Sequence, residues 1–159
     1  MGADVTGVDA ATESIAIARE HAAAMGLSID YRSGELAELG LGTFDLVTCM
    51  EVLEHVADKP AFMAQLAAHL VPGGLLILST PNRTPAARAL LVTAAEGFGM
   101  IPRGTHEWHD FVTPEELTAL LGAAGFAIES LRGIAFSPAK GLHVSDDLRL
   151  DMIVAARWA

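Results

Sequence analysis

Short apolar runs alternate with stretches of helical period along this chain. The apolar runs, each bounded by polar or turn-forming residues, predict strands at residues 3–9, 27–32, 44–50 and 75–80. Between them, apolar positions spaced three or four residues apart predict helices at 12–25 and 60–70. Gly26 ends the first helix and the sequence VPGG ends the second. This alternation predicts a doubly wound, mostly parallel α/β sheet.

Residues 83–110 interrupt the alternation. They contain no clear βα unit and are long for a plain connection, so they predict an inserted segment with one mostly apolar helix at about 85–96. Arg83 and Arg103 flank its apolar positions. The segment is therefore expected either to form a lid over the sheet or to contact an anionic membrane surface through residues 83–103.

A regular pattern returns near the C-terminus. Thr113 is a good N-cap residue, Pro114 suits the first helical position, and two acids follow in the first turn, so a helix is expected from here to about 122–125. Residues 126–134 and 152–157 then predict two closing strands in an antiparallel hairpin.

Composition limits the function classes. A chain of 159 residues with 52% apolar and 19% charged residues fits a single globular domain. A net charge of −10 argues against nonspecific nucleic-acid binding, which needs a basic face. Cys49 is the only cysteine, so no intrachain disulfide forms, and its apolar surroundings predict a buried, inert thiol. These features suit a reducing, cytoplasmic environment.

Three ionisable side chains follow the apolar strand in the stretch FDLVTCMEVLEHV. Glu51, Glu54 and His55 are spaced so that one turn of helix would point all three the same way. Open α/β sheets bind ligands where strands end, so a binding site is predicted here. Two carboxylates and an imidazole favour Mg²⁺ or Mn²⁺ over a cysteine-based zinc site. The alternative is that these residues cap a helix and close the pocket without a metal.

The order of motifs along the chain identifies a family resemblance. VTGVD, a helix, G-E-L, FDLVTCMEVLEHV, L-x-PGG-L-L-I-L-S-T and a late GFAIESLRG together resemble a class I S-adenosylmethionine-dependent methyltransferase. CMEVLEHV, STPNRTP and IPRGTHEWHDFVTPEEL narrow the resemblance to the ubiquinone-biosynthesis O-methyltransferases. The resemblance implies a Rossmann-like fold, S-adenosylmethionine as cofactor, and methylation of phenolic hydroxyls on polyprenylated ring intermediates.

The resemblance also assigns cofactor-binding roles. It places the cofactor ribose at Asp9, where a strand-end carboxylate accepts bonds from both hydroxyls; the alternative is a helix N-cap. It places the adenine beside Leu36 in the Gly34-containing turn, which a structural turn would explain equally well. It places Met50 against the cofactor, although a methionine there also suits a core.

Further roles follow from the same resemblance. Members with the E-x-x-E-H pattern are associated with Mg²⁺, which would lower the phenol pKa and orient its oxygen. His106 and His109 are candidate general bases, because a phenol of pKa about 10 is mostly un-ionised at neutral pH; the alternative is a solvated turn. A polyprenyl substrate favours a location at the inner membrane surface.

The resemblance finally implies an upstream segment. Such enzymes begin with a strand and a glycine-rich loop before the VTGVD strand, whereas this sequence starts at Met1 just before it. We therefore expect residues 1–159 to be one N-terminally truncated methyltransferase domain, whose start lies upstream. The rival functions are a class I methyltransferase with another small-molecule acceptor, and a truncated, non-catalytic chain.

Overall fold

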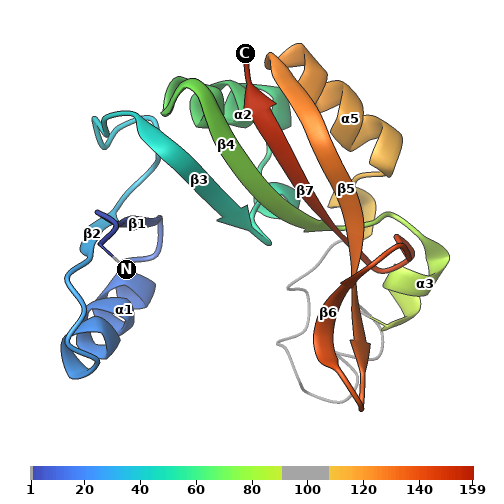
Figure 1. The fold of residues 1–159 in the computed structure, drawn as a ribbon, viewed down its shortest axis with the longest axis horizontal. Helices are drawn as coiled ribbons and strands as arrows, with labels where there is room; N and C mark the ends of the chain where they lie inside the picture. Colours follow the sequence, from blue (N-terminus) through green and yellow to red (C-terminus); the bar gives the residue numbers. More distant parts are fainter. Residues whose placement is uncertain (1, 91–107) are drawn as a thin grey trace. The chain divides into compact units, whose positions relative to one another are not determined.

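The computed structural model describes residues 2–90 and 108–159 (Figure 1). The chain divides into two compact units, Met1–Gly42 and Thr43–Ala159.

The first unit consists of a parallel strand pair and one helix. β1 (Thr6–Asp9) and β2 (Asp30–Ser33) pair in parallel, with α1 (Thr12–Ala24) between them in the chain. The helix and both strands were predicted, but each strand begins three residues later than expected. Gly26 follows the C-cap of α1 with a φ of 65°, a conformation that glycine adopts without steric cost.

The second unit contains a mixed sheet in the order β3-β4-β7-β5-β6. Its strands are β3 (Phe44–Met50), β4 (Leu70–Pro81), β5 (Phe126–Ser137), β6 (Gly141–Ser145) and β7 (Asp151–Trp158). β3 and β4 are parallel, whereas β7, β5 and β6 join the sheet by antiparallel pairing. The amino end of β7 therefore lies beside the carboxyl end of β4, with Asp151 opposite Pro81.

Short helices complete this unit. They are η1 (Leu53–His55), α2 (Lys59–Ala68), α3 (Pro85–Ala87), η3 (Trp108–Asp110) and α5 (Pro114–Ala123). Helices α2 and α5 contact each other, and both contact the sheet. Helix α2 contacts β4 and helix α5 contacts β5, and Leu76, Leu78 and Val154 of the central strands β4 and β7 are fully buried. Within the described ranges, no helix combines the length and apolar character needed to cross a membrane.

Two expectations about strands were wrong. β4 starts at Leu70 rather than at residue 75, because the VPGG sequence forms an irregularity within the strand. Phe44 pairs with Leu70 and Leu46 with Leu75, so the four residues between have no partners in β3. The two closing strands do pair antiparallel, but β6 lies between them in the chain and was missed. With only five residues and several exposed apolar side chains, β6 carries a weak pattern.

The inserted segment begins as expected. Thr84 caps α3, and its hydroxyl accepts a hydrogen bond from the Ala87 backbone N–H at 3.0 Å. The remainder of the helix expected at 85–96 lies largely outside the described residues. Helix α5 carries the predicted cap at Thr113 in the form of a capping box. The Thr113 hydroxyl accepts from the Glu116 N–H at 3.3 Å, and the Glu116 carboxylate accepts from the Thr113 N–H at 2.9 Å.

This capping box yields a stability prediction. Replacing Thr113 by alanine leaves the Glu116 N–H without its acceptor, so we expect the Thr113→Ala variant to lose about 1 kcal/mol of unfolding free energy. Urea denaturation followed by circular dichroism measures the loss. The matched control is Thr118→Ala in the same helix, whose hydroxyl bonds only the Pro114 carbonyl and where alanine is the better helix former. Equal losses in both variants would contradict the prediction.

Candidate functional site

Asp9 ends β1 beside the turn that leads into α1. Its Oδ1 accepts a hydrogen bond from the Ala11 backbone N–H at 2.7 Å, and its side chain is exposed. The N-cap of α1 is Ala11 and makes no side-chain cap, so Asp9 closes the turn before the helix instead of capping it. This arrangement fixes the exposed carboxylate at the strand end, and a carboxylate has further lone pairs that can accept hydroxyl donors.

Leu36 lies in a turn after β2. Because β1 and β2 are parallel and Asp9 pairs with Ser33, the turn that follows Ser33 lies at the same strand edge as Asp9. The Gly34 N–H donates to the Asp9 carbonyl at 3.1 Å and joins the two strand ends. A side chain at Gly34 would meet Leu39 at 3.1 Å, and its φ of 145° suits glycine. Within this first unit the two predicted cofactor positions are thus neighbours.

Met50 and Glu51 mark the end of β3 in the second unit. Met50 is 46% exposed, so it is no core residue in this structure. Glu51 has a φ of 53°, which is uncommon for a residue with a side chain. Its N–H donates to the Ser79 carbonyl at 3.1 Å and to the Ser79 hydroxyl at 3.2 Å, and that hydroxyl donates to Glu51 Oε1. Ser79 therefore holds both the backbone and the carboxylate of Glu51.

The expected common helical face of Glu51, Glu54 and His55 was wrong. Only the latter two belong to η1, because the left-handed backbone at Glu51 ends the strand before the helix begins. Glu54 is 3% exposed, and its Oε2 accepts from the Thr80 hydroxyl at 3.0 Å. Its Oε1 finds no hydrogen-bond partner among the described residues, and His55 Nε2 lies 4.0 Å away.

A metal site is not assembled in this arrangement. Among residues 2–90 and 108–159, no group of three or more His, Cys, Asp or Glu side chains is placed to hold a metal ion. Glu51 is engaged with Ser79, and Glu54 with Thr80. The buried Oε1 of Glu54 is the one feature that suits a cation, because a buried carboxylate oxygen without a donor is costly.

Asp151, at the start of β7, lies close enough to Glu51 and Glu54 to feel their charges, and it was not predicted as a site residue. We call these three carboxylates, Glu51, Glu54 and Asp151, the acidic edge. Burial first, and then the negative charge of Glu51, raise the pKa of Asp151 to about 7, although the Met152 N–H opposes the shift. The Asp151 Oδ1 accepts a hydrogen bond from the Met152 backbone N–H at 2.7 Å. The sequence shows a carboxylate directly before the apolar run MIVAA, but its position next to Glu51 depends on the antiparallel pairing of β7 with β4, which the sequence alone does not reveal.

Cys49, one residue before Met50, is buried as predicted, with 5% of its surface exposed. Burial, together with the charges of Glu54 and Glu51, raises the pKa of the Cys49 thiol to about 12. The thiol is therefore a poor nucleophile at neutral pH.

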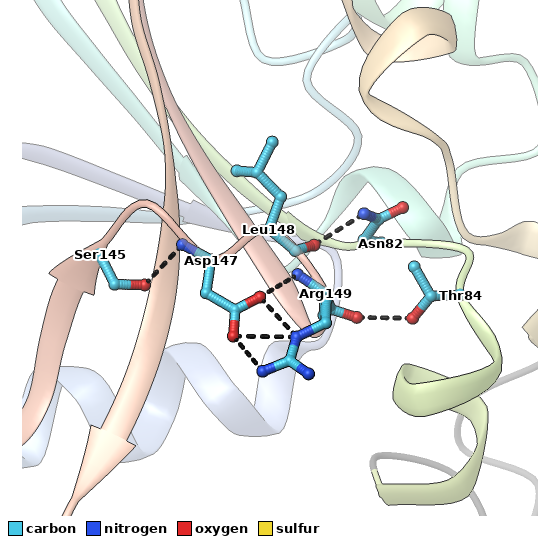
Figure 2. A network of polar contacts seen from close by, with 6 residues as sticks. All are labelled: Asn82, Thr84, Ser145, Asp147, Leu148 and Arg149. Carbon is cyan, nitrogen blue, oxygen red and sulfur yellow. Dashed lines mark hydrogen bonds and ion pairs between the residues drawn. The ribbon is translucent and has the colours of Figure 1, made fainter.

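A polar network fixes the loop that leads into β7 (Figure 2). The Asn82 side-chain amide donates to the Leu148 carbonyl at 2.7 Å, and the Thr84 hydroxyl donates to the Arg149 carbonyl at 2.5 Å. Arg149 in turn pairs with Asp147 at 2.6 Å. Asn82 is 5% exposed and directly follows β4, so it holds this loop, and with it the start of β7, beside the acidic edge.

The two ends of the inserted segment meet at its base. The Arg83 N–H donates to the Val112 carbonyl at 3.1 Å, and the Trp108 indole donates to the Thr84 carbonyl at 3.0 Å. Arg83 also pairs with Glu116. The Thr113 N–H first, and then Arg83, lower the pKa of Glu116.

His109, one of the two candidate bases, lies in η3 next to Trp108. His109 is exposed, and its ring contacts the edge of Trp108 at a centroid distance of 5.2 Å. Its role as a base stays a prediction. His106 lies outside the described residues.

The chain matches a known protein family over most of its length. A family described as "Methyltransferase domain" matches residues 1–131, which is most of the chain. The chain belongs to the class I methyltransferase family. The predicted family and α/β fold class are thereby confirmed.

Curated relatives share one description. The chain is 46% identical over 142 residues to the ubiquinone biosynthesis O-methyltransferase of Xanthomonas euvesicatoria, covering 87% of this chain and 59% of the relative. It is 44% identical over 162 residues to the protein of the same description from Sinorhizobium fredii, covering 99% of this chain and 65% of the relative. The chain therefore spans less than two thirds of the length of these relatives.

Solved structures agree on the fold. The magnesium protoporphyrin IX methyltransferase of Synechocystis, solved with bound S-adenosylhomocysteine, has a TM-score of 0.67 and 25% identity; the match covers 99% of this chain and 67% of that one. A methyltransferase from Methanosarcina mazei has a TM-score of 0.67 at 20% identity, covering 98% of this chain and 82% of the other.

The acidic edge predicts a pH dependence of stability. The pKa of Asp151 is about 7 in the folded chain and near 3.8 when unfolded, so the folded state holds the proton more tightly. Its stabilising contribution is complete below pH 3.8 and is lost as the pH rises through 7. We expect the unfolding free energy of the wild type to fall progressively between about pH 4 and 7 relative to that of Asp151→Asn and to level off above that range, as measured by urea denaturation. Asp45→Asn, exposed on β3, is the control and should follow the wild type; parallel curves for wild type and Asp151→Asn would contradict the assignment.

Proposed function

We propose that this chain transfers a methyl group from S-adenosylmethionine to a phenolic hydroxyl of a polyprenylated ubiquinone precursor. The observation that carries the proposal is 44–46% identity to proteins described as ubiquinone biosynthesis O-methyltransferases over 87–99% of the chain. The match to the Sinorhizobium fredii relative covers 99% of the chain and therefore spans both units and the inserted segment. The proposal places the protein in the cytoplasm, with peripheral contact to the membrane through residues 83–103.

The proposed reaction is an in-line displacement. The phenolic oxygen attacks the methyl carbon, the carbon–sulfur bond breaks, and its electron pair leaves with S-adenosylhomocysteine. The hydroxyl proton leaves the oxygen before or during attack, so a base raises the rate. His109 and His106 are the proposed acceptors of that proton. Alignment of oxygen, carbon and sulfur in a water-poor pocket supplies much of the remaining rate enhancement.

The proposed cofactor-binding residues lie at or just after the carboxyl ends of strands. We propose that Asp9 accepts hydrogen bonds from the ribose hydroxyls, that Leu36 lies against the adenine, and that Met50 lies against the cofactor. The exposed carboxylate of Asp9, fixed by the Ala11 N–H, and the 46% exposure of Met50 support these roles.

The second candidate function is methyl transfer to another small-molecule acceptor. The structural neighbours favour it, because the fold serves different acceptors: one neighbour is a magnesium protoporphyrin IX methyltransferase. The two functions differ in the acceptor that is turned over, and not in cofactor binding.

Cofactor binding and acceptor choice test the proposal together. We expect S-adenosylhomocysteine to bind the wild type in calorimetric titration, and Asp9→Ala to weaken it at least tenfold, because hydrogen bonds to a carboxylate are strong. Asp4→Ala, exposed in the same unit, is the control and should bind normally.

We expect methyl transfer to a polyprenyl catechol and much less to a catechol without the tail. If the chain binds S-adenosylhomocysteine but methylates neither phenol, the second function is favoured. If Asp9→Ala binds S-adenosylhomocysteine as tightly as the wild type, the role of Asp9 is contradicted.

Magnesium dependence remains a separate prediction. If Glu51, Glu54 and His55 hold Mg²⁺, calorimetric titration of MgCl₂ should show binding to the wild type, at least tenfold weaker in Glu54→Gln, which keeps the shape and removes the charge. Glu115→Gln, exposed in the first turn of α5, is the control and should titrate like the wild type. Absence of Mg²⁺ binding, or equal binding in Glu54→Gln, would contradict the site.

A further inference from the structure

The β5–β6 hairpin displays an apolar face. Phe136 is 71% exposed, Leu142 76% and Val144 57%. Phe136 pairs with Leu142, and Ile134 with Val144, so these four side chains lie on one face of the two strands. Large apolar side chains exposed side by side in this way cost free energy in water unless they serve contact with another surface.

The charge of the hairpin differs from that of the whole chain. Residues 130–145 contain no aspartate or glutamate, although the chain carries a net charge of −10. Lys140 is exposed in the turn at the tip, and Arg132 lies nearer the base, where it pairs with Asp146 at 3.0 Å. The tip is therefore apolar with a positive charge, which is complementary to an anionic surface.

The base of the hairpin is firmly held. Gly133 is buried against the next loop so closely that a side chain there would meet the Asp147 carbonyl oxygen at 1.8 Å. The Ser145 hydroxyl accepts from the Asp147 N–H at 3.2 Å, and the loop that follows is bound by Asn82 and Thr84 (Figure 2). Beyond this anchor the hairpin extends away from helices α2 and α5 (Figure 1). A fixed base presents the tip in a defined direction.

We propose that the tip of this hairpin, residues 134–144, inserts its apolar face into the headgroup region of an anionic lipid bilayer. The face comprises four side chains on two short strand segments, which is too small for the roughly 1,200 Å² or more that a stable protein interface buries. Shallow insertion of a few apolar side chains beside a basic residue is sufficient for reversible membrane contact. The inference adds a contact surface to that proposed for residues 83–103, and it does not depend on which acceptor is methylated.

Vesicle binding tests the proposal without cofactor or substrate. Sedimentation with vesicles of equimolar phosphatidylglycerol and phosphatidylcholine should show binding of the wild-type chain. The double variant Phe136→Ser/Leu142→Ser should bind at least tenfold more weakly, because it removes the largest exposed apolar surface of the tip. The matched control is Ile17→Ser/Met25→Ser, which removes two side chains of similar exposure, 68% and 64%, from the α1 region. Binding that is lost equally in both double variants, or in neither, would overturn the proposal.

The charge and the depth of insertion give two further readouts. Lys140→Glu should weaken binding about tenfold, and pure phosphatidylcholine vesicles should bind weakly. An environment-sensitive maleimide probe attached through Leu142→Cys should shift its emission to the blue on vesicle addition, and Cys49 is buried and should not compete for the label. An unshifted probe would overturn insertion.

A second copy of the chain is the rival occupant, since β6 is the last strand of the described sheet and its edge is open to pairing. A concentration-dependent dimer that Phe136→Ser/Leu142→Ser dissociates, with vesicle binding unchanged, would replace the membrane by that copy.

Discussion

The hydrogen bonds between Glu51 and Ser79 determine the geometry of the acidic edge. They join the residue after β3 to a residue within β4, and they hold Glu51 in a left-handed backbone conformation. That conformation turns the chain out of the strand, so that η1 starts at Leu53 with Glu54 directed inward. Strain of this kind persists only where surrounding contacts compensate it, and two acceptor atoms of one serine do so here. The placement of Glu54 and His55 in η1 follows from this turn.

Three carboxylates gather at this edge from separate parts of the chain. Glu51 follows β3, Glu54 belongs to η1, and Asp151 begins β7. Burial, and after it repulsion by Glu51 and Glu54, raises the pKa of Asp151 to about 7, so that this carboxyl holds a proton up to near neutral pH and the electrostatic cost of bringing the three groups together is lower. Antiparallel insertion of β7 between β4 and β5 is what brings Asp151 here. A fully parallel sheet would place the start of that strand at the opposite edge.

The sequence predicted well the features that depend on local chemistry. Apolar runs located β3 and the core of β4, Gly26 located the end of α1, and Thr113 located the cap of α5. Features that depend on pairing between residues distant in the chain were not predicted from the sequence. β6 has a half-exposed pattern that depends on its partner β5, and the left-handed Glu51 depends on Ser79. Asp151 was not predicted as a site residue, because its position depends on the order of the strands in the sheet, which composition and hydrophobic periodicity do not encode.

The two ends of the inserted segment are held together, which makes this segment the part of the fold where related proteins can differ most easily in length and in acceptor. Arg83 reaches Val112, and Trp108 reaches Thr84, so the chain leaves the sheet and returns to it at nearly one point. With its ends already held together, each doubling of the segment's length adds only about 0.6 kcal/mol of closure entropy. Changes in the length of the chain beyond α3 are therefore expected to cost the fold little, whereas the buried Ala87 and the Thr84 cap tie the start of the segment to the sheet. Natural variation in chain length and in acceptor is expected to concentrate in the segment beyond α3, while the strand ends stay constant.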